Sequence, residues 1–501
     1  MKKLELLILI FILLGGFVVR LYKFDGPIAD WHSWRQADTS AVSRNFVKFG
    51  YDILFPRFDD LSNGVSLLDN PRGYRFVEFP FYNILQAGFY QIFNRFTIEE
   101  WGRLVSIFSS LGAIFFLFLL VKKHVSTRAG LIAAFFYAFV PYNIYYGRTI
   151  LPDTLMVMAF LGGLYFFGQY LDEISNLKSQ NSKLHLKAQI LFLLSIIFTA
   201  SALLIKPFVV FYFLAFLYLV FMKFGLRGFG KPEVWAFFVL VTLPFILWRM
   251  WMQNFPEGIP RNDWLYNWNS IRFKGSFYWW IFAERISRMI LGYWGLPFVI
   301  MGLLFKPGNR EKLLFFTFVI SSLIYVHVFA TGNVQHDYYQ ILIIPTLAIF
   351  FAKGVDGALT AAKEYFSLWT TRIIAIVNIV FMLMFGWYVI RDFYGVQHPE
   401  IIEAGIAVDQ LTPKDAKIIA PYNGDTAFLY QTNRQGWPVF ERSFREFRNA
   451  GATHIAFANP TKEELNISTL FEPVKITDTY AIFDLNKPTP EGLKELQKKI
   501  K

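Results

Sequence analysis

About eleven long apolar runs limit what this chain of 501 residues can fold into. Most have about 17–25 residues, the length that a helix needs to cross the roughly 30 Å hydrocarbon core of a bilayer. The composition agrees, because 55% of the residues are hydrophobic and only 17% are charged, against about 25% charged residues in a soluble domain. The runs lie near residues 4–21, 101–121, 128–146, 153–171, 188–205, 207–222, 233–252, 285–304, 313–330, 339–352 and 372–391. We therefore predict a mainly α, polytopic membrane helix bundle.

Basic residues between the runs predict the topology. Lys and Arg are in excess in cytoplasmic loops, so Lys2 and Lys3 place the N-terminus in the cytoplasm. Further basic residues gather in alternate loops, at 122–128, 172–187, 223–231, 305–312 and 353–372. All these loops are cytoplasmic if 22–100 is one external segment, so the apolar stretch 79–96 must lie in the interface or re-enter. We expect a multi-pass protein of the cytoplasmic membrane.

Two features of the composition bear on partners. The net charge of +12 can indicate nucleic-acid binding. The basic residues lie in short loops between apolar runs, however, where they indicate membrane topology. We therefore predict the lipid bilayer as a partner and no nucleic acid. The first run resembles a signal peptide, but no small-x-small cleavage site follows it, so we expect an uncleaved span. The chain has no Cys, which excludes disulfides and Cys-ligated metals.

The chain changes character near residue 393. Residues 1–392 are predicted to form the transmembrane domain, with 22–100 as its first external loop containing interfacial helices, and residues 393–501 a small soluble α/β domain outside the cytoplasm. In this tail, 417–421 and 453–458 are β-like and 474–485 looks like a hairpin or strand. Helical patterns cover 399–411 and 443–450, where Gly451 acts as a stop. We expect 487–501 to be a mobile basic tail.

The loop Asp30–Thr39 is the first candidate for a site. Its ten residues hold two carboxylates, an imidazole, a guanidinium, an amide and two indoles, and ionisable groups at membrane level indicate function by default. Asp30 or Asp38 can accept a proton from a hydroxyl nucleophile or hold a divalent cation. Arg35 and His32 can bind a phosphate oxygen. The alternative for Asp38 and Thr39 is a helix N-cap, because the residues up to Gly50 look helical.

Three further groups fall on the same predicted side. Glu78 opens the interfacial stretch, and is either solvated or part of a site. Arg148 and Asp153 either pair with each other, or hold an anion and orient a partner. Lys206 interrupts an apolar stretch and either snorkels or meets a phosphate. His336 and Asp337 precede a short span, where His336 is either a satisfied loop histidine or a phosphate contact.

Together, carboxylates and cations from at least four loops are predicted to converge on one face. That arrangement suits an anionic lipid-phosphate substrate, because its leaving group needs charge stabilisation. A carboxylate base would activate the acceptor, and the lipid tail would enter between spans.

The order of these features resembles the GT-C glycosyltransferases, in particular the family 39-like group with the protein O-mannosyltransferases and the bacterial aminoarabinose transferase. The matching features are Glu78-Phe79-Pro80, Gly102-Arg103-Leu104, Arg148 to Asp153, and His336-Asp-Tyr-Tyr before a late span, with a soluble tail at the end. The resemblance implies a polyprenyl-phosphate sugar donor, inversion at the anomeric carbon, a catalytic Asp in the first external loop and, in some members, a divalent cation such as Mg or Mn.

The sequence departs from this family at one place. Many members carry Asp-Glu early in the loop, where this chain has Arg35-Gln36. The carboxylate must then come from Asp38, which we favour, or from Asp30.

We thus expect a membrane glycosyltransferase that transfers a hexosyl or pentosyl group to an acceptor hydroxyl on a protein, lipid or cell-envelope glycan. The predicted catalytic carboxylates are Asp38, Asp30 and Glu78, with Asp38 and Glu78 as metal ligands if a cation is used. The predicted donor-phosphate contacts are Arg148, Lys206, Arg35 and His336, and the residues that shape the site are His32, Asp153 and Asp337. A transporter or lipid flippase is the alternative; it would favour charges inside spans and repeated halves, which this sequence lacks. A non-catalytic assembly or receptor protein is a third possibility.

Overall fold

The computed structural model describes residues 3–176, 182–362 and 367–497. The chain divides into two compact units. Unit 1 comprises Met1–Phe24, Arg103–Met250 and Asn262–Asp392, and unit 2 comprises Asp25–Gly102, Trp251–Arg261 and Phe393–Lys501. The predicted boundary at 392/393 coincides with one division point, although unit 2 joins the tail to most of the predicted first external loop. The assignment of a transmembrane and an extracytoplasmic domain stays a prediction.

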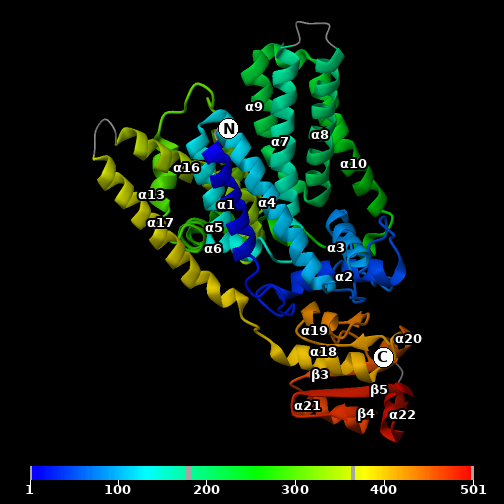
Figure 1. The fold of residues 1–501 in the computed structure, drawn as a ribbon. Helices are drawn as coiled ribbons and strands as arrows, with labels where there is room; N and C mark the ends of the chain where they lie inside the picture. The colour runs from blue at the N-terminus through cyan, green and yellow to red at the C-terminus, as the bar shows by residue number, and fades with distance from the viewer. Residues whose placement is uncertain (1–2, 177–181, 363–366, 498–501) are drawn as a thin grey trace. The chain divides into compact units, whose positions relative to one another are not determined.

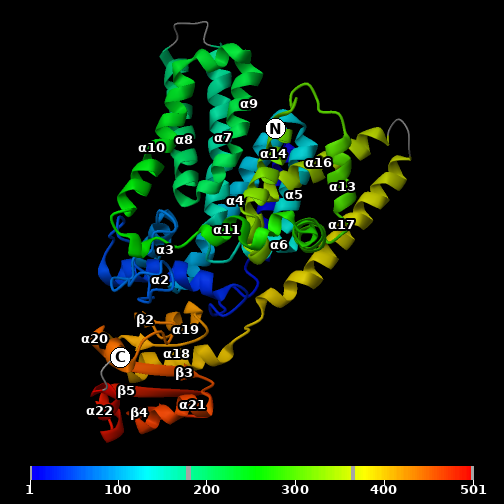
Figure 2. The same ribbon diagram turned by 180° about the vertical axis from the view of Figure 1, so that it is seen from behind.

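Unit 1 is built from helices. Its longer helices are α1 (Lys3–Val19), α4 (Ile98–His124, which enters unit 1 at Arg103), α5 (Thr127–Phe139), α7 (Asp153–Asn176), α8 (Ser182–Ile205), α9 (Phe213–Phe224), α10 (Pro232–Met252), α14 (Leu314–Val328), α16 (Ile344–Ala361) and α17 (Leu368–Ile390). Its shorter elements are α6 (Pro141–Tyr146), η1 (Pro207–Tyr212), η2 (Gly225–Gly230), α11 (Asp263–Asn267), η4 (Trp268–Phe273), α12 (Gly275–Tyr278), η5 (Trp279–Ile290), α13 (Leu296–Leu304), α15 (Ala330–Gln335) and η6 (Asp337–Ile343). Helices α7, α8 and α9 stand side by side in both ribbon views (Figure 1, Figure 2).

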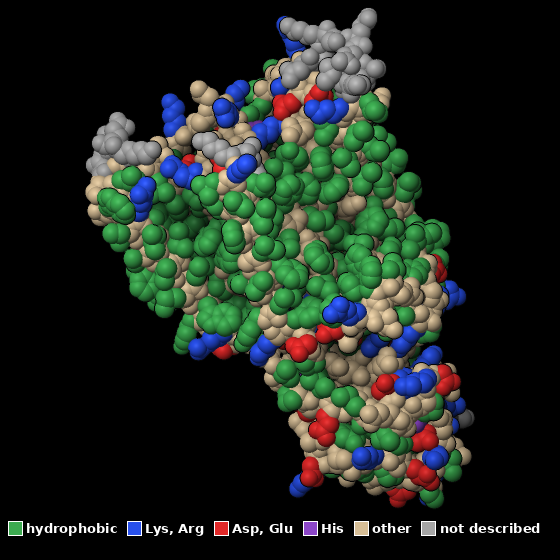
Figure 3. Space-filling model, in the orientation of Figure 1, with side chains coloured by type: hydrophobic (Ala, Val, Ile, Leu, Met, Phe, Trp, Pro, Cys, Tyr) green, Lys and Arg blue, Asp and Glu red, His purple; other side chains and the backbone are tan. Residues whose placement is uncertain are grey.

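Unit 1 is a multi-pass membrane structure. Among the described residues, seven helical segments are long and apolar enough to cross a bilayer: Ile98–His124, Asp153–Ser175, Leu186–Ile205, Pro207–Gly230, Pro232–Met252, Asp337–Ala361 and Leu368–Leu411. The other predicted runs correspond to α1, to α5 with α6, to α14, and to η5 with α13. Hydrophobic side chains cover much of the face of unit 1 seen in Figure 3. The predicted polytopic helical class is confirmed.

The predicted span at 285–304 is not one continuous helix. The run 285–304 is two elements, because η5 ends at Ile290 and α13 begins at Leu296. Between them, Gly292 and Tyr293 have positive φ angles of 49° and 61°, a left-handed conformation that cannot continue a right-handed helix.

Small residues set the closest helix contacts in unit 1. Where α13 crosses α16, a Cβ added to Gly302 would lie 1.9 Å from the carbonyl oxygen of Phe350, and one added to Gly354 would lie 1.8 Å from that of Phe298. Such contact without side chains is how apolar helices gain packing energy inside lipid.

Unit 2 combines helices of residues 25–102 with a five-stranded sheet from the tail. Its main elements are α2 (Ser33–Phe49), α3 (Phe81–Ile92), α18 (Pro399–Leu411), α19 (Thr426–Gln431), α20 (Phe444–Asn449), α21 (Lys462–Leu465), α22 (Pro490–Gln497) and the strands β1 (Ile418–Ile419), β2 (Gly436–Trp437), β3 (His454–Ala458), β4 (Phe471–Ile476) and β5 (Tyr480–Pro488). Two 3-10 turns, η3 (Pro256–Gly258) and η8 (Asn466–Thr469), complete it, and η7 (Arg391–Tyr394) lies at the division point.

The strand order is β2-β1-β3-β5-β4, with β1 parallel to β2 and β3, and β5 antiparallel to β3 and β4. The segment before α3 extends this sheet, because Asp60 forms a parallel bridge with Gly436 at the β2 edge. Leu61 then joins the core formed by Trp437, Phe447 and Phe483.

The predictions for the tail are largely confirmed. The helix at 399–411 has the bounds expected from the sequence, and Ser443 caps α20 through a capping box with Glu446. The run 474–485 is part of the β4–β5 hairpin. The mobile tail is wrong for 487–497, which finish β5 and form α22; 498–501 lie outside the described residues, as do 177–181 and 363–366 of the predicted cytoplasmic loops.

Helix α3 agrees with the prediction for 79–96. Its twelve residues span roughly 18 Å at about 1.5 Å per residue, which is shorter than a hydrocarbon core of about 30 Å.

Candidate active site

Helix α2 carries most of the polar residues predicted from the opening loop. It begins at Ser33 after His32, whose backbone is left-handed, and ends at Phe49 before Gly50, whose φ is 91°. Its buried residues include a long polar set: Ser33, Arg35, Gln36, Asp38, Thr39, Ser40, Ser43 and Asn45. Because the helix starts five residues before Asp38, the alternative that Asp38 and Thr39 form its N-cap is wrong.

Asp38 is held by residues from two other segments of unit 2. Its Oδ2 lies 2.6 Å from Arg75 Nη2, and its Oδ1 accepts a 2.7 Å hydrogen bond from the hydroxyl of Thr426, the first residue of α19. The carboxylate is only 4% exposed. A buried carboxylate with fixed partners is well oriented, as a base needs to be.

The other predicted residues of this loop have partners of their own. Arg35 forms an ion pair with Glu78 and donates to Thr39 Oγ1 at 3.1 Å. Asp30 accepts a 2.6 Å hydrogen bond from Gln36 Nε2. The ring of His32 packs edge-on against Trp31 at 5.2 Å. Unit 2 therefore brings together Arg35 with Glu78, but binds Asp38 to residues that sequence reasoning missed.

Two missed carboxylates also belong to the surroundings of Asp38. Burial raises the pKa of Asp60 to about 7, although its hydrogen bonds with Ser62 oppose the shift, and the negative charge of Asp38 adds to it. Burial and Asp38 likewise raise the pKa of Asp425. The negative charge of Asp38 therefore acts on both Asp60 and Asp425, and Arg75 is the cation paired with Asp38.

A second contact joins the tail to α2. The phenol of Tyr430 on α19 donates to Glu99 and lies 3.0 Å from Ser40 Oγ, while Arg44 stacks on its ring at 3.9 Å. Arg44 also pairs with Asp59 at 2.5 Å. No pattern in the sequence predicted these contacts, although Asp59 and Asp60 form an acidic doublet in the predicted external loop.

In unit 1, Lys206 pairs with Asp153. Lys206 lies between α8 and η1, and its Nζ is 2.7 and 2.8 Å from the two carboxylate oxygens of Asp153, the first residue of α7. The rings of Tyr338 and Tyr339 lie 5.5 and 5.7 Å from the same ammonium. Both charged residues are buried. The predicted alternative of an Arg148–Asp153 pair is not formed.

Arg148 and His336 are also in unit 1. Arg148 is 1% exposed, donates to the carbonyl of Lys23 at 3.1 Å and lies 5.4 Å from the ring of Tyr145. His336 stacks on Tyr338 and Tyr339 with ring centres 5.4 and 5.9 Å away. Since these tyrosines also flank Lys206, the structure brings His336 and Lys206 to the same aromatic pair.

Asp337 is surrounded by groups that sequence reasoning missed. Tyr146 donates to its carboxylate, Tyr142 donates to its backbone carbonyl at 2.6 Å, and Arg285 lies 3.7 Å from Oδ2. Asp337 is 1% exposed. A buried carboxylate with an arginine and a phenol is fully engaged, which indicates that it positions its neighbours.

The fold is similar to that of solved GT-C glycosyltransferases, and the predicted resemblance is confirmed at the level of the fold. Residues 77–251 match the model of the dolichyl-phosphate-mannose-protein mannosyltransferase family. None of the curated protein sequences matches the chain.

Two solved structures have a fold similar to that of this protein over nearly the whole chain. ArnT from Cupriavidus metallidurans, bound to undecaprenyl phosphate, is similar over 95% of this chain and 97% of its own, with a TM-score of 0.64 and 13% identity. The archaeal oligosaccharyltransferase AglB from Archaeoglobus fulgidus, with an inhibitory peptide and a dolichol-phosphate, is similar over 93% of this chain and 70% of its own, with a TM-score of 0.57 and 11% identity. At these identities the likeness is one of fold.

The donor set does not fit the divalent cation predicted at Asp38 and Glu78. Each of these carboxylates engages an arginine. Within the described ranges, no group of three or more His, Asp or Glu residues is placed to hold a metal ion. No step is therefore assigned to a cation.

Proposed function

We propose that this protein is an inverting glycosyltransferase that moves a sugar from a polyprenyl-phosphate carrier to an acceptor hydroxyl at the external face of the cytoplasmic membrane. The observation that carries the proposal is the full-length likeness to a solved ArnT that holds undecaprenyl phosphate. A similar fold in AglB is associated with a dolichol-phosphate. Undecaprenyl phosphate and dolichol-phosphate are both lipid phosphates. They belong to the class of anionic substrate that the cationic and acidic residues of this chain were predicted to bind.

Asp38 is the proposed base. Its carboxylate takes the proton of the acceptor hydroxyl while the acceptor oxygen bonds to the anomeric carbon, and the bond from that carbon to the carrier phosphate oxygen breaks. The electron pair leaves with the phosphate, so the product is the carrier phosphate and the configuration inverts. Thr426 and Arg75 orient Asp38 in this role, and Asp30, which Gln36 binds, is the second candidate.

Lys206 is the proposed contact for the carrier phosphate. An ammonium has three donors, and the two hydrogen bonds to Asp153 leave one donor for a phosphate oxygen. A cation there stabilises the charge that develops on the leaving group. His336, which shares the tyrosine pair with Lys206, and Arg148 are proposed as further contacts, as is Arg35, whose partner is Glu78.

A transfer assay tests these roles. The purified protein, in membranes, receives labelled polyprenyl-phosphate sugars and acceptor extract. We expect Asp38→Asn to lower transfer by about 10²–10⁴-fold, the usual contribution of a general base, with Asp30→Asn and Glu78→Gln compared beside it. Asp52→Asn is the matched control, since Asp52 is an exposed carboxylate of the same unit. Full transfer by Asp38→Asn would remove Asp38 from the role.

That Asp38, Arg148 and Lys206 share one pocket stays a prediction from the sequence. The chain has no Cys, so a cysteine pair at positions 38 and 206 would be the only thiols present. A short bifunctional reagent should link them in the folded protein. Failure to link at any reagent length below about 15 Å, when both thiols react singly, would contradict a common pocket.

A further inference from the structure

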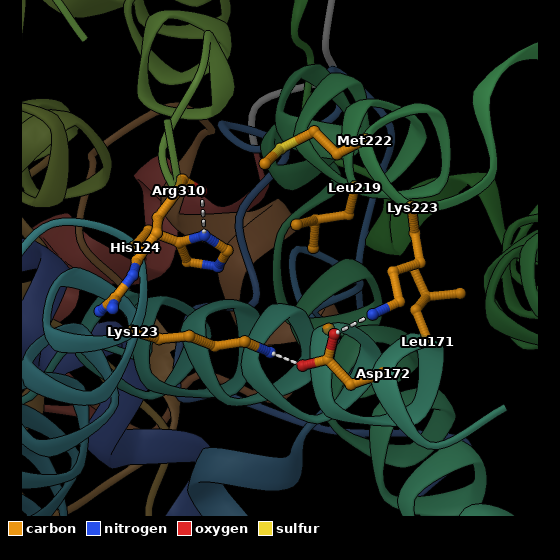
Figure 4. A pocket seen from close by; sticks show the side chains of 9 residues that line it. Lys123, His124, Leu171, Asp172, Leu219, Met222, Lys223 and Arg310 are labelled. Atoms are coloured by element: carbon orange, nitrogen blue, oxygen red, sulfur yellow. Dashed lines mark hydrogen bonds and ion pairs between the residues drawn. The ribbon is translucent and has the colours of Figure 1, made fainter. Parts of the chain in front are cut away.

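A hollow of about 240 Å³ lies at the ends of three helices of unit 1. Lys123 and His124 come from the last turn of α4, Asp172 from α7, Lys223 from the end of α9, and Arg310 from the segment before α14. We call this set the basic hollow (Figure 4). Its volume is about eight times the roughly 30 Å³ share of one liquid water molecule, so it can admit a phosphate group.

The basic hollow is far from Lys206 and Asp153. Asp153 begins α7 and Asp172 is nineteen positions later on the same helix, which is roughly 28 Å at about 1.5 Å per residue. That distance matches the hydrocarbon core of a bilayer, so the two charged sites lie at opposite faces of the membrane. If the proposed transfer is external, the basic hollow faces the cytoplasm, and Lys and Arg are indeed frequent at the end of unit 1 where the chain begins (Figure 3).

The charges of the basic hollow are positive in sum. Asp172 bridges two lysines: Lys123 Nζ lies 2.6 Å from its Oδ2 and Lys223 Nζ lies 2.9 Å from its Oδ1. Arg310 is a third cation, and its carbonyl lies 3.2 Å from Nδ1 of His124. Three cations and one carboxylate leave a charge of +2 with His124 neutral. Asp172 alone therefore cannot neutralise the site.

The groups are reachable as well as fixed. The side chains of Lys123, Lys223 and Asp172 are 25%, 32% and 38% exposed. Leucine and methionine side chains line the rest of the hollow, together with Gly168 on α7, where a Cβ would lie 3.5 Å from Lys123 Nζ. A polar anchor beside apolar walls suits a molecule with an anionic head and an acyl chain.

We propose that the basic hollow binds the phosphate of an anionic membrane phospholipid. Cationic pockets between transmembrane helices on the cytoplasmic side attract such headgroups, since that leaflet is negatively charged. Lys123 and Lys223 hold the phosphodiester oxygens in competition with Asp172, Arg310 adds charge, and the acyl chains lie along the apolar walls. This site is separate from the residues of the proposed transfer chemistry, but its cytoplasmic placement rests on the external face proposed for that transfer.

Native mass spectrometry of the full-length protein in detergent tests the proposal. The probes are phosphatidylglycerol, zwitterionic phosphatidylcholine, and soluble glycerol phosphate. We expect retained phosphatidylglycerol in the wild type and a loss of about tenfold or more in Lys123→Gln/Lys223→Gln, because two charge-assisted hydrogen bonds are removed. Lys122→Gln is the matched control: Lys122 is its neighbour on α4, lies over the ring of Phe118 at 5.6 Å and does not line the hollow.

Two further variants separate binding from a structural ion pair. Asp172→Asn removes the carboxylate that binds the ammonium groups of Lys123 and Lys223, so retention of phosphatidylglycerol should rise. If Asp172 only bridges the two lysines structurally, retention should not rise and the protein should be less stable. Gly168→Leu keeps every charge but fills the hollow, so it should lose the lipid even if the lysine variants fail to fold. Equal retention of both lipids, or full competition by glycerol phosphate, which would indicate a site for free phosphate, overturns the proposal.

Discussion

Asp60 makes a measurable prediction about pH and stability. Its carboxyl group is 5% exposed and its pKa is raised from 3.8 to about 7, chiefly by burial. Between these two values the folded protein holds a proton that the unfolded chain has lost, so the free energy of unfolding falls as pH rises. A shift of about three units at about 1.4 kcal/mol each amounts to about 4 kcal/mol, a loss that begins near pH 4 and is complete just above pH 7.

Asp60→Asn should remove this loss. The amide keeps an oxygen to accept the 2.7 Å hydrogen bond from the backbone N–H of Ser62, but it cannot ionise. At pH 8 we expect the variant to be more stable than the wild type by up to about 4 kcal/mol, which for a unit of roughly 200 residues raises the melting temperature by on the order of 10 °C. At pH 4 the two proteins should match.

The assay is thermal unfolding of the detergent-purified protein between pH 4 and pH 8, followed by tryptophan fluorescence. Asp52→Asn is the control, because Asp52 is exposed in the same unit and should leave the pH dependence unchanged. Parallel pH profiles for wild type and Asp60→Asn would refute the reasoning.

Three further predictions concern packing and buried pairs. Lys206→Met leaves the Asp153 carboxylate buried without its ion-pair partner and should destabilise the protein by about 3–5 kcal/mol. Adding Asp153→Leu should restore the melting temperature but not sugar transfer. A double variant as unstable as the single variant would contradict this prediction. Gly354→Ala should prevent accumulation of folded protein in membranes, since its Cβ would lie 1.8 Å from the Phe298 carbonyl oxygen, while Gly308→Ala, with nothing within 4 Å, should accumulate normally. Tyr430→Phe removes the hydroxyl that contacts Glu99 and Ser40 and should lower stability by about 1–3 kcal/mol; an unchanged melting temperature would show that this contact is not stabilising.

The sequence predicted well what depends on local pattern. Apolar runs located the helices of unit 1, and the helix at 399–411 has its expected bounds, because Pro399 starts it and its apolar period is regular. The start of α2 was missed because residues 33–40 bury polar side chains against polar partners, so the helix has no apolar stripe to reveal its first turns.

The partners in the candidate site were harder to predict. Arg75 and Thr426 are 37 and 388 residues from Asp38 in the chain, and no residue pattern links them. The sequence suggested an ion pair between Arg148 and Asp153 because the two residues are near neighbours in the chain. In the structure Asp153 pairs instead with Lys206, whose position after α8 depends on how α7 and α8 pack.

The contact of Thr426 with Asp38 also has a consequence for biosynthesis. Asp38 is made early, and Thr426 only after most of the chain has left the ribosome. A nascent or truncated protein therefore contains α2 without the hydroxyl that orients Asp38, and the strand edge at Gly436 that pairs with Asp60 is missing as well. A prematurely terminated chain therefore lacks both contacts, and its Asp38 keeps Arg75 as the remaining partner described above.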